Sequence, residues 1–361
     1  MQALPTLALA LLTLVPTVPA AQQVERYTLG GDDIAIYNLA GALAVEPGTG
    51  RVTVELTRGG ADAGRLQVER GELRDRETLR VVYPSQDVAY AGLESGSSTS
   101  LKVREDGTFG DSDHDHDDDD GDDGDRPQGR TVRITRDRGD LRAHADMKVQ
   151  VPAGHRVAFH LAVGRVSVAN VDGEIVVDSH SAPVTATAPR GSFDVDVGSG
   201  NVRVTGGEGT LNVDTGSGSV EVTGFRGEEL SIDTGSGQVS GSELNARSIR
   251  VDTGSGDIEL TAVTCPELAL DTGSGSISTE VRGPVRDLTL ETGSGDISVR
   301  APASLSGEVE IETASGEIET DFAIQVTRHA RDHVVGRIGE GVGRVAIETG
   351  SGDVRLLKSA K

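Results

Sequence analysis

The sequence contains no tryptophan, and its 361 residues include only four tyrosines and five phenylalanines. Large aromatic side chains contribute much of the burial in a conventional globular core, so their scarcity argues against a core of that kind. Glycine, in contrast, occurs 48 times. This composition is typical of a thin core of Val, Ile and Leu that is repeated along a stack.

Cysteine and positive charge are also scarce. Cys265 is the one cysteine, which excludes an internal disulfide bond. We expect it to be a small buried side chain, with intermolecular pairing as the alternative. The chain has 34 Lys and Arg against 58 Asp and Glu, a net charge of −24. Nucleic acids and anionic lipids are bound by basic patches, so neither is expected as a partner.

The longest apolar run is at the beginning of the chain. Residues 1–20, MQALPTLALALLTLVPTVPA, end in small residues at Val18 and Ala20, which predicts a signal peptide cleaved after Ala20. The usual basic segment is absent, and a short membrane anchor is the alternative. No later run approaches the ~20 apolar residues of a membrane helix. We therefore expect the mature chain to be extracytoplasmic (periplasmic, on the cell surface or secreted) and not inserted in a membrane.

A repeat of 18–21 residues occupies most of the chain. Its copies are FDVDVGSGNVRV from Phe193, LNVDTGSGSVEV from Leu211, LSIDTGSGQVSG from Leu230, IRVDTGSGDIEL from Ile249, LALDTGSGSIST from Leu268, LTLETGSGDISV from Leu288, VEIETASGEIET from Val309 and VAIETGSGDVRL from Val345. An acidic residue precedes each corner: Asp196, Asp214, Asp233, Asp252, Asp271, Glu291, Glu312 and Glu348. The steps between them are 18, 19, 19, 19, 20, 21 and 36 residues. Stepping back by 18 gives Asp178 and His160 in degenerate copies.

Each copy predicts a strand, a tight corner and a second strand. Leu211 and Val213 alternate with polar residues before the corner, and Val220 and Val222 do so after it. A period of two marks strands with one buried face, and stacking similar coils at ~4.8 Å buries those faces. We therefore predict an all-β fold, a β-solenoid or β-helix-like stack of 18–21-residue coils with short strands and TGSG corners.

The corner itself has a structural explanation. Glycine reaches positive φ without strain and has no Cβ to clash with the next coil. The first glycine is replaced by Ala314 in one copy, which indicates that this position is less demanding than the second. The corner threonines, such as Thr215 and Thr234, are expected to stack as a ladder whose hydroxyls satisfy one another.

The remaining segments divide the chain further. Residues 21–104 alternate like strands and predict irregular coils that cap the stack, residues 105–129 predict an acidic disordered loop, and residues 130–357 predict the regular coils. The arginines that follow the acidic loop are interpreted as local charge compensation. Residues 321–343 are expected to form a degenerate coil with a loop, and Val345–Leu357 to close the rod.

Three features resemble the bacterial family of exported β-strand-repeat proteins known as "putative adhesin", a domain of unknown function. They are the VPAG turn at Val151–Gly154, the serial corners, and the ending GRIGEG followed by VAIETGSGDVRL. The resemblance covers about residues 30–356. It implies a stacked β fold and an exported protein, and it provides no ligand or active site.

We predict no catalytic, cofactor-binding or metal-binding residues. D-T-G-S is also the signature of aspartic proteases, but stacked copies place their carboxylates in an external column instead of a facing pair. Calcium could bind between neighbouring carboxylates of that column, which runs from Asp196 to Glu312, and so bridge the coils. A row of solvated carboxylates is the simpler interpretation. His114 and His116 within the acidic run could capture a transition metal weakly.

We therefore predict a non-catalytic, adhesin-like binding or scaffold protein of the bacterial envelope, with a protein or an envelope polymer as partner. One alternative is a β-helix enzyme acting on polysaccharide. Such enzymes need clustered acids, bases and usually aromatic platforms, and this chain repeats its acids uniformly. Another alternative is an envelope assembly or signalling component that associates end to end or side by side.

Overall fold

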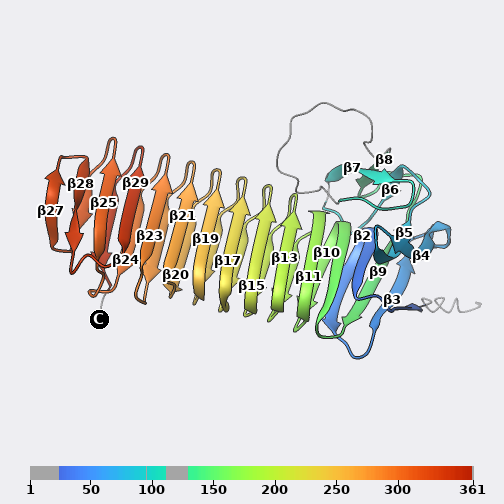
Figure 1. Cartoon of the computed structure of the whole chain (residues 1–361). Coiled ribbons are helices and arrows are strands. Elements are labelled where there is room, and N and C mark those ends of the chain that lie inside the picture. The colour runs from blue at the N-terminus through green and yellow to red at the C-terminus, as the bar shows by residue number, and fades with distance from the viewer. Residues whose placement is uncertain (1–23, 95, 111–128, 360–361) are drawn as a thin grey trace, which may run out of the picture.

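The computed structural model describes residues 24–94, 96–110 and 129–359. The predicted signal peptide and nearly all of the acidic loop, with His114 and His116, lie outside the described residues. The chain forms an irregular N-terminal β region and a long rod of stacked coils (Figure 1). Nearly all regular structure is β-strand, which confirms the predicted all-β solenoid.

Each coil of the rod contributes one longer strand to a front sheet. These strands pair in parallel, and their corner acids align in one row: Asp178 pairs with Asp196, Asp196 with Asp214, and Asp214 with Asp233. The front strands are β10 (His155–Ala169), β11 (Asp172–Ser181), β13 (Arg190–Val197), β15 (Glu208–Thr215), β17 (Arg226–Thr234), β19 (Asn245–Thr253), β21 (Glu267–Thr272) and β23 (Asp287–Thr292).

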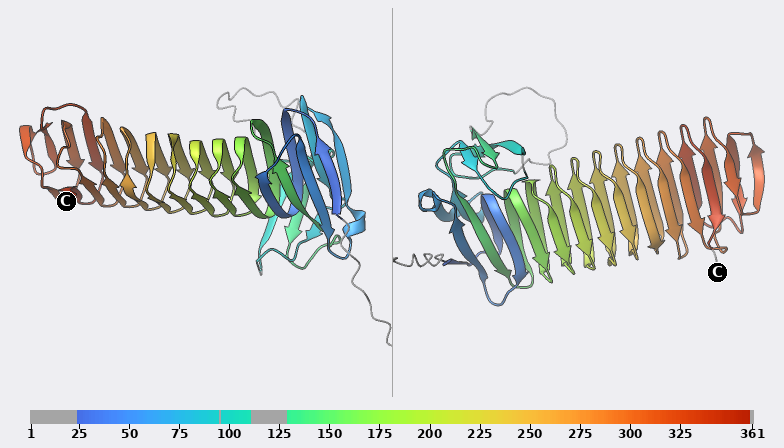
Figure 2. Two further views of the ribbon diagram at one scale, coloured as in Figure 1. Left: turned by 90° about the horizontal axis from the view of Figure 1, so that it is seen from below. Right: turned by 180° about the vertical axis from the view of Figure 1, so that it is seen from behind.

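Shorter strands form a back sheet, which is also parallel and in register, and to which the end of β10 contributes. They are β12 (Val184–Thr187), β14 (Val202–Thr205), β16 (Val220–Thr223), β18 (Val239–Ser242), β20 (Ile258–Val263), β22 (Ile277–Val281) and β24 (Ile297–Ala301). The core lies between the sheets, where the inward residues of each coil are buried, for example Leu211, Val213, Val220 and Val222. The two views in Figure 2 show the rod as a flat double layer.

The TGSG glycines are required by close packing between coils. Gly216 and Gly218 lie outside the left-handed region, so the expected positive φ is wrong for this corner. A Cβ on Gly218 would lie 1.8 Å from the carbonyl oxygen of Gly200, and one on Gly216 would lie 2.6 Å from that of Gly198. The second position is therefore the more demanding one, as the sequence predicts. The left-handed residues lie at the opposite corner, where Gly224 has φ 73° and Ala262 has φ 56°.

The corner threonines are buried, and their hydroxyls do not satisfy one another as expected. Thr234 Oγ1 accepts a hydrogen bond from the Gly237 amide (3.1 Å) and donates one to the Gly218 carbonyl of the neighbouring coil (3.3 Å). The same inter-coil bond recurs at Thr253, Thr272 and Thr292. The difference arises because the inward threonine lies within hydrogen-bond distance of the buried glycine carbonyl of the neighbouring corner. Each threonine thus locks its own corner to the coil beside it.

The N-terminal region mixes parallel and antiparallel strands. Its strands are β1 (Val24–Leu29), β2 (Asp33–Pro47), β3 (Val52–Gly59), β4 (Gln67–Leu73), β5 (Arg76–Val82), β6 (Asp87–Ala89), β7 (Ser98–Arg104), β8 (Gly129–Thr135) and β9 (His144–Val151), with a 3-10 turn at Ala63–Arg65. β2 stacks in parallel on β10 and on β5, which continues the front sheet. β8 and β9 pair with strands of this region, so the regular coils begin at β10 and not at residue 130. Alternation alone does not specify a strand's partner.

The C-terminal coils do not stack in sequence order. β29 (Arg344–Thr349) pairs with β23 on one side and with β25 (Gly307–Thr313) on the other. β30 (Val354–Lys358) likewise lies between β24 and β26 (Ile318–Thr320). The last coil of the sequence is therefore inserted inside the rod, and the prediction that Val345–Leu357 closes it is wrong. An antiparallel hairpin of β27 (Ile324–His329) and β28 (His333–Ile338) covers β25 and forms the tip.

No helix in the described part of the chain has the length and hydrophobicity required to cross a membrane.

Candidate functional site

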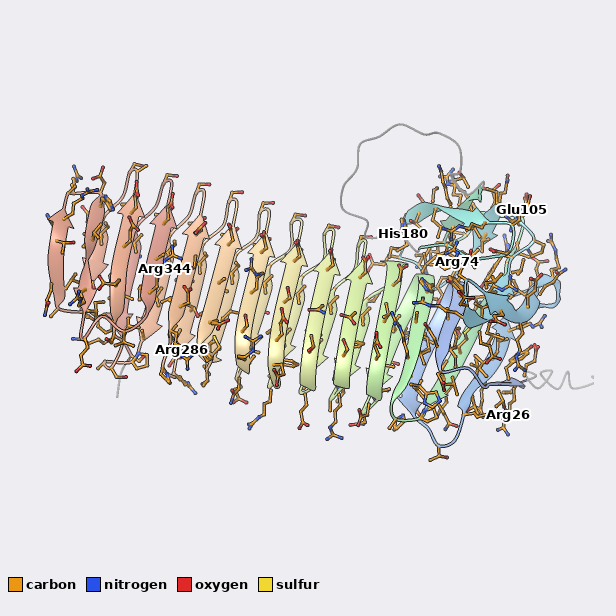
Figure 3. The ribbon with its side chains drawn as sticks, in the orientation of Figure 1. Arg26, Arg74, Glu105, His180, Arg286 and Arg344 are labelled. Carbon is orange, nitrogen blue, oxygen red and sulfur yellow. The ribbon has the colours of Figure 1, made fainter. Side chains whose placement is uncertain are left out.

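The outward side chains of the front sheet stand in rows along the rod (Figure 3). Strand alternation and the parallel register produce these rows, because every second residue of each coil faces solvent beside its counterpart in the next coil. Where the rod meets the N-terminal region, the β4–β5 turn at Leu73 and Arg74 rises beside this face, together with the segment at Asp106 and Thr108. The result is a groove of about 810 Å³ across the first coils.

Part of the floor of the groove is less polar than the coils next to it. In the row two residues before the corner acids, the coils further along carry Asn212, Ser231 and Arg250. At the N-terminal end of the groove the same row is Ala35, Ala158 and Val176, and Asp194, Asn212 and Ser231 continue it along the groove. The first three positions provide a small apolar patch, because Cβ and methyl groups replace polar side chains at the point where the wall stands.

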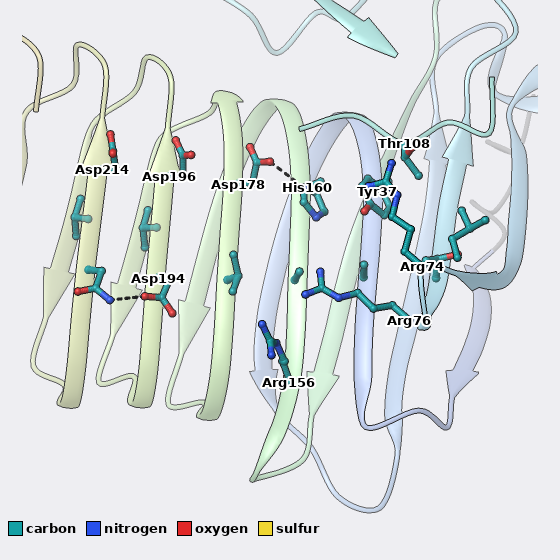
Figure 4. Close-up of a pocket in the computed structure, with 18 of the residues that line it drawn as sticks. Tyr37, Arg74, Arg76, Thr108, Arg156, His160, Asp178, Asp194, Asp196 and Asp214 are labelled. Carbon is teal, nitrogen blue, oxygen red and sulfur yellow. Dashed lines mark hydrogen bonds and ion pairs between the residues drawn. The ribbon is translucent and has the colours of Figure 1, made fainter. Parts of the chain in front are cut away.

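An aromatic stack closes the N-terminal end of the floor. The rings of Tyr37 and His160 are parallel, 4.2 Å apart, and both side chains are nearly fully buried. Phe109 packs edge-on against both rings. His160 Nδ1 lies 2.9 Å from Asp178 Oδ2, as drawn in Figure 4. This imidazole is thus fixed by a ring on its face and a carboxylate at its edge.

Arginines line one side of the groove (Figure 4). Arg76 Nε contacts Asp33 Oδ2 at 3.2 Å, and Arg156 Nε contacts Glu174 Oε1 at 3.3 Å. A guanidinium carries five N–H donors, so one Nε contact leaves donors on the terminal nitrogens. Arg74 completes this set from the β4–β5 turn.

Carboxylates line the opposite side. They are Asp178, Asp194, Asp196, Asp214 and Asp233, supplied by four successive coils. Asp194 accepts hydrogen bonds from Asn212 Nδ2 (2.6 Å) and from Ser192 Oγ (3.0 Å), which fixes its orientation. The groove therefore has a guanidinium rim, a small apolar floor and a carboxylate rim.

The row of corner acids continues beyond the groove. Register pairs Asp233 with Asp252, Asp252 with Asp271, Asp271 with Glu291, Glu291 with Glu348, and Glu348 with Glu312. Desolvation at the sheet surface raises the pKa of Asp233, and the carboxylates of Asp214 and Asp252 raise it further. Desolvation and Asp252 likewise raise the pKa of Asp271. The row is thus external and mutually repulsive, as the sequence predicts, and its acids do not face each other in pairs.

Among residues 24–94, 96–110 and 129–359, no group of three or more His, Cys, Asp or Glu is arranged to hold a metal ion. The groove residues were not foreseen as a site, because Tyr37, Arg74 and Arg76 lie outside the repeat. Ala158 and Val176 interrupt the polar row in the sequence, but Ala269 does so outside the groove, so the interruption alone does not mark the site.

A family model matches residues 128–357. The chain belongs to the Toastrack DUF4097 family. The match spans β8 to β30, so the floor strands from β10 onward and the whole carboxylate rim belong to the Toastrack part. Arg74, Arg76 and Tyr37 come from the preceding residues. The groove is therefore built jointly by the Toastrack rod and the N-terminal region.

Two solved structures are similar to this Toastrack chain at low identity. One is a putative cell adhesion protein from Clostridium sporogenes (9% identity, TM-score 0.23, covering 94% of this chain and 100% of the other). The second is a putative adhesin from Parabacteroides distasonis (11% identity, TM-score 0.34, covering 94% and 98%). TM-scores this low do not bear on what this chain binds. Among curated proteins, none matches the sequence significantly.

Proposed function

We propose that this Toastrack protein is a non-catalytic, adhesin-like binding module of the bacterial envelope, located outside the cytoplasm, and that it binds its partner through the groove. Its partner is an envelope protein or an envelope polymer. The apolar run at residues 1–20 supports export.

The observation that carries this proposal is the groove at the junction of the rod and the N-terminal region. Its volume of about 810 Å³ falls within the usual range of ligand sites, roughly 300–1,000 Å³. The floor consists of parallel strands tied to neighbours on both sides, so the binding groups are held on a rigid surface. Rigid placement reduces the ordering cost of binding.

Catalysis is less well supported than binding. Hydrolysis of a glycosidic bond needs two carboxyl groups in different environments, one held as an acid and the other as a base. Asp196 and Asp214 occupy equivalent places on adjacent coils, so the repeat gives them similar surroundings. His160 is buried between Tyr37 and Asp178, which suits a structural role better than proton transfer to a substrate.

Co-sedimentation with purified envelope fractions tests the proposal. The wild-type chain is expected to sediment with cell-wall sacculi or outer-membrane material, and Val176→Phe, which fills the floor, is expected to abolish this. Ala269→Phe is the matched control, because Ala269 occupies the same row on β21, outside the groove. Equal sedimentation of both variants, or release of sugar reducing ends by the wild type, would refute the proposal.

A further inference from the structure

We infer that the groove binds a short zwitterionic peptide, with its free carboxyl end against the arginine rim and its ammonium groups against the carboxylate rim. This inference rests on the proposed function, because it names the class of ligand that the same groove takes.

The separation of charge across the groove supports a ligand with two ends of opposite charge. Arg74, Arg76 and Arg156 come from the wall and the first coil, where Asp106 also lines the groove, whereas five aspartates line it from β11 to β17. A purely cationic ligand would meet the guanidiniums at one end. A purely anionic ligand would meet five aspartates at the other.

The arginine rim is suited to a carboxylate. Figure 4 shows Arg76 reaching across the sheet face and Arg156 rising from β10 beside it. Both engage Asp33 or Glu174 through Nε, and the terminal nitrogens of a guanidinium bind a planar carboxylate in a bidentate manner. A peptide carboxyl terminus is the simplest group of that geometry that also leads into an apolar chain.

The floor and the distances suit a peptide of about four residues. From β10, which carries Arg156, to β15, which carries Asp214, there are three strand spacings through β11 and β13. Three spacings of ~4.8 Å give about 14 Å across the strands. The register places Arg156 level with Thr210, so Asp214 lies four residues further along its strand, which adds about 13 Å in that direction. The diagonal is about 20 Å, which four extended residues of ~3.3 Å each cover together with the lysine and arginine side chains. Between the rims, Ala158 and Val176 offer room and apolar contact for small side chains.

The carboxylate rim is suited to ammonium groups. Each coil presents one acid in the corner row, and Asp194 adds a second at the floor. Adjacent carboxylates repel by about 1 kcal/mol even at the dielectric of water. An ammonium group placed between two coils relieves this repulsion and donates up to three hydrogen bonds.

Titration calorimetry on the mature chain tests the inference with the tetrapeptide Lys-Ala-Ala-Ala as probe. We expect the free acid to bind about tenfold more tightly than its carboxyl-terminal amide, which is the usual contribution of a hydrogen bond to a charged group. Acetylation of both amines is expected to weaken binding by a similar factor. Equal affinities for the acid, the amide and the acetylated peptide would overturn the inference without any variant.

Substitutions assign each end of the peptide to its rim. Arg156→Gln is expected to weaken binding of the free-acid peptide about tenfold. It is expected to change the affinity for the amide by less than about twofold, the usual limit of additivity. Asp214→Asn should lower the affinity for the peptide with free amines and leave the affinity for the acetylated peptide unchanged. Asp271→Asn, in the same row but outside the groove, is the control and should change nothing.

Two outcomes separate this inference from the proposed function. If Val176→Phe abolishes sedimentation with envelope material while Lys-Ala-Ala-Ala does not bind the wild type, the groove is a binding site and the zwitterionic ligand class is wrong. If the tetrapeptide binds with the expected dependence on both ends while envelope material does not, the ligand class stands and the envelope role is wrong.

Discussion

Alanine at the second corner glycine is expected to separate two coils of the rod. In the coil of β17, a Cβ on Gly237 would lie 1.8 Å from the carbonyl oxygen of Gly218. The first glycine of the same corner, Gly235, would place its Cβ 2.4 Å from the carbonyl oxygen of Gly216. A carbon meets a carbonyl oxygen comfortably at about 3.3 Å, so Gly237→Ala forces a shift of about 1.5 Å and Gly235→Ala one of about 0.9 Å.

The larger shift breaks identifiable hydrogen bonds. Thr234 Oγ1 donates to the Gly218 carbonyl at 3.3 Å, and the Gly235 amide donates to the Thr215 carbonyl at 3.0 Å, both between the same two coils. Each lost bond costs about 1 kcal/mol, so Gly237→Ala should destabilise the rod by about 2–3 kcal/mol. Gly235→Ala should cost about 1 kcal/mol or less, consistent with alanine at the equivalent residue, Ala314.

Urea unfolding followed by circular dichroism measures both free energies, and hydrogen exchange at the Gly235 amide reports the local opening of the corner. Neighbouring coils stabilise one another in a stacked repeat, so the exchange measurement is needed if unfolding is not two-state. Equal losses of stability in the two variants, within about 0.5 kcal/mol, would refute the close-packing explanation of the corner.

Four further perturbations test other parts of the rod. Because the pKa of Asp233 is raised, native Asp233 binds its proton more tightly than the unfolded chain does, and the stability of the wild type should fall as pH rises through that pKa. Asp233→Asn should therefore be more stable than the wild type at pH 7. Urea midpoints should show that this advantage disappears below the ordinary aspartate pKa of about 4. The buried hydroxyl of Thr279 has no hydrogen-bond partner among the described residues, so Thr279→Val should raise the free energy of unfolding by about 1 kcal/mol. Burial raises the pKa of the Cys265 thiol to about 12, so a maleimide should label it at pH 8 only in denaturant. Ala262 has φ 56°, a left-handed conformation that is strained for alanine and not for glycine. Ala262→Gly should therefore raise the free energy of unfolding by about 0.5–1 kcal/mol, which is measured as a higher melting temperature.

The sequence was sufficient to predict the coil, its corner and the outward row of acids. All three follow from local rules: the alternation of Leu211 and Val213, the near-identity of successive corners, and the constant step between acids. A parallel stack of such units then fixes the register, because a slip by one residue would bury Asp214 and expose Val213.

The order of the last coils and the groove could not be predicted in the same way. The corners at Thr292, Thr313 and Thr349 are nearly interchangeable in sequence, so local chemistry does not determine which coil stacks on β23. The groove depends on where the β4–β5 turn lies relative to the rod, which is a long-range arrangement. The hydrogen bonds of the corner threonines also required the positions of neighbouring carbonyls.

The insertion of β29 and β30 between earlier coils has a consequence for how the molecule is completed. Ribosomal synthesis delivers residues 344–358 after β23 and β25, yet these residues form an internal layer of the rod between them. The distal end therefore cannot reach its final arrangement by simple addition of one coil after another. Until β29 is available, β23 and β25 either leave its position empty or pair with each other and then separate. Removal of β29 and β30 would therefore alter the rod within its length as well as at its tip.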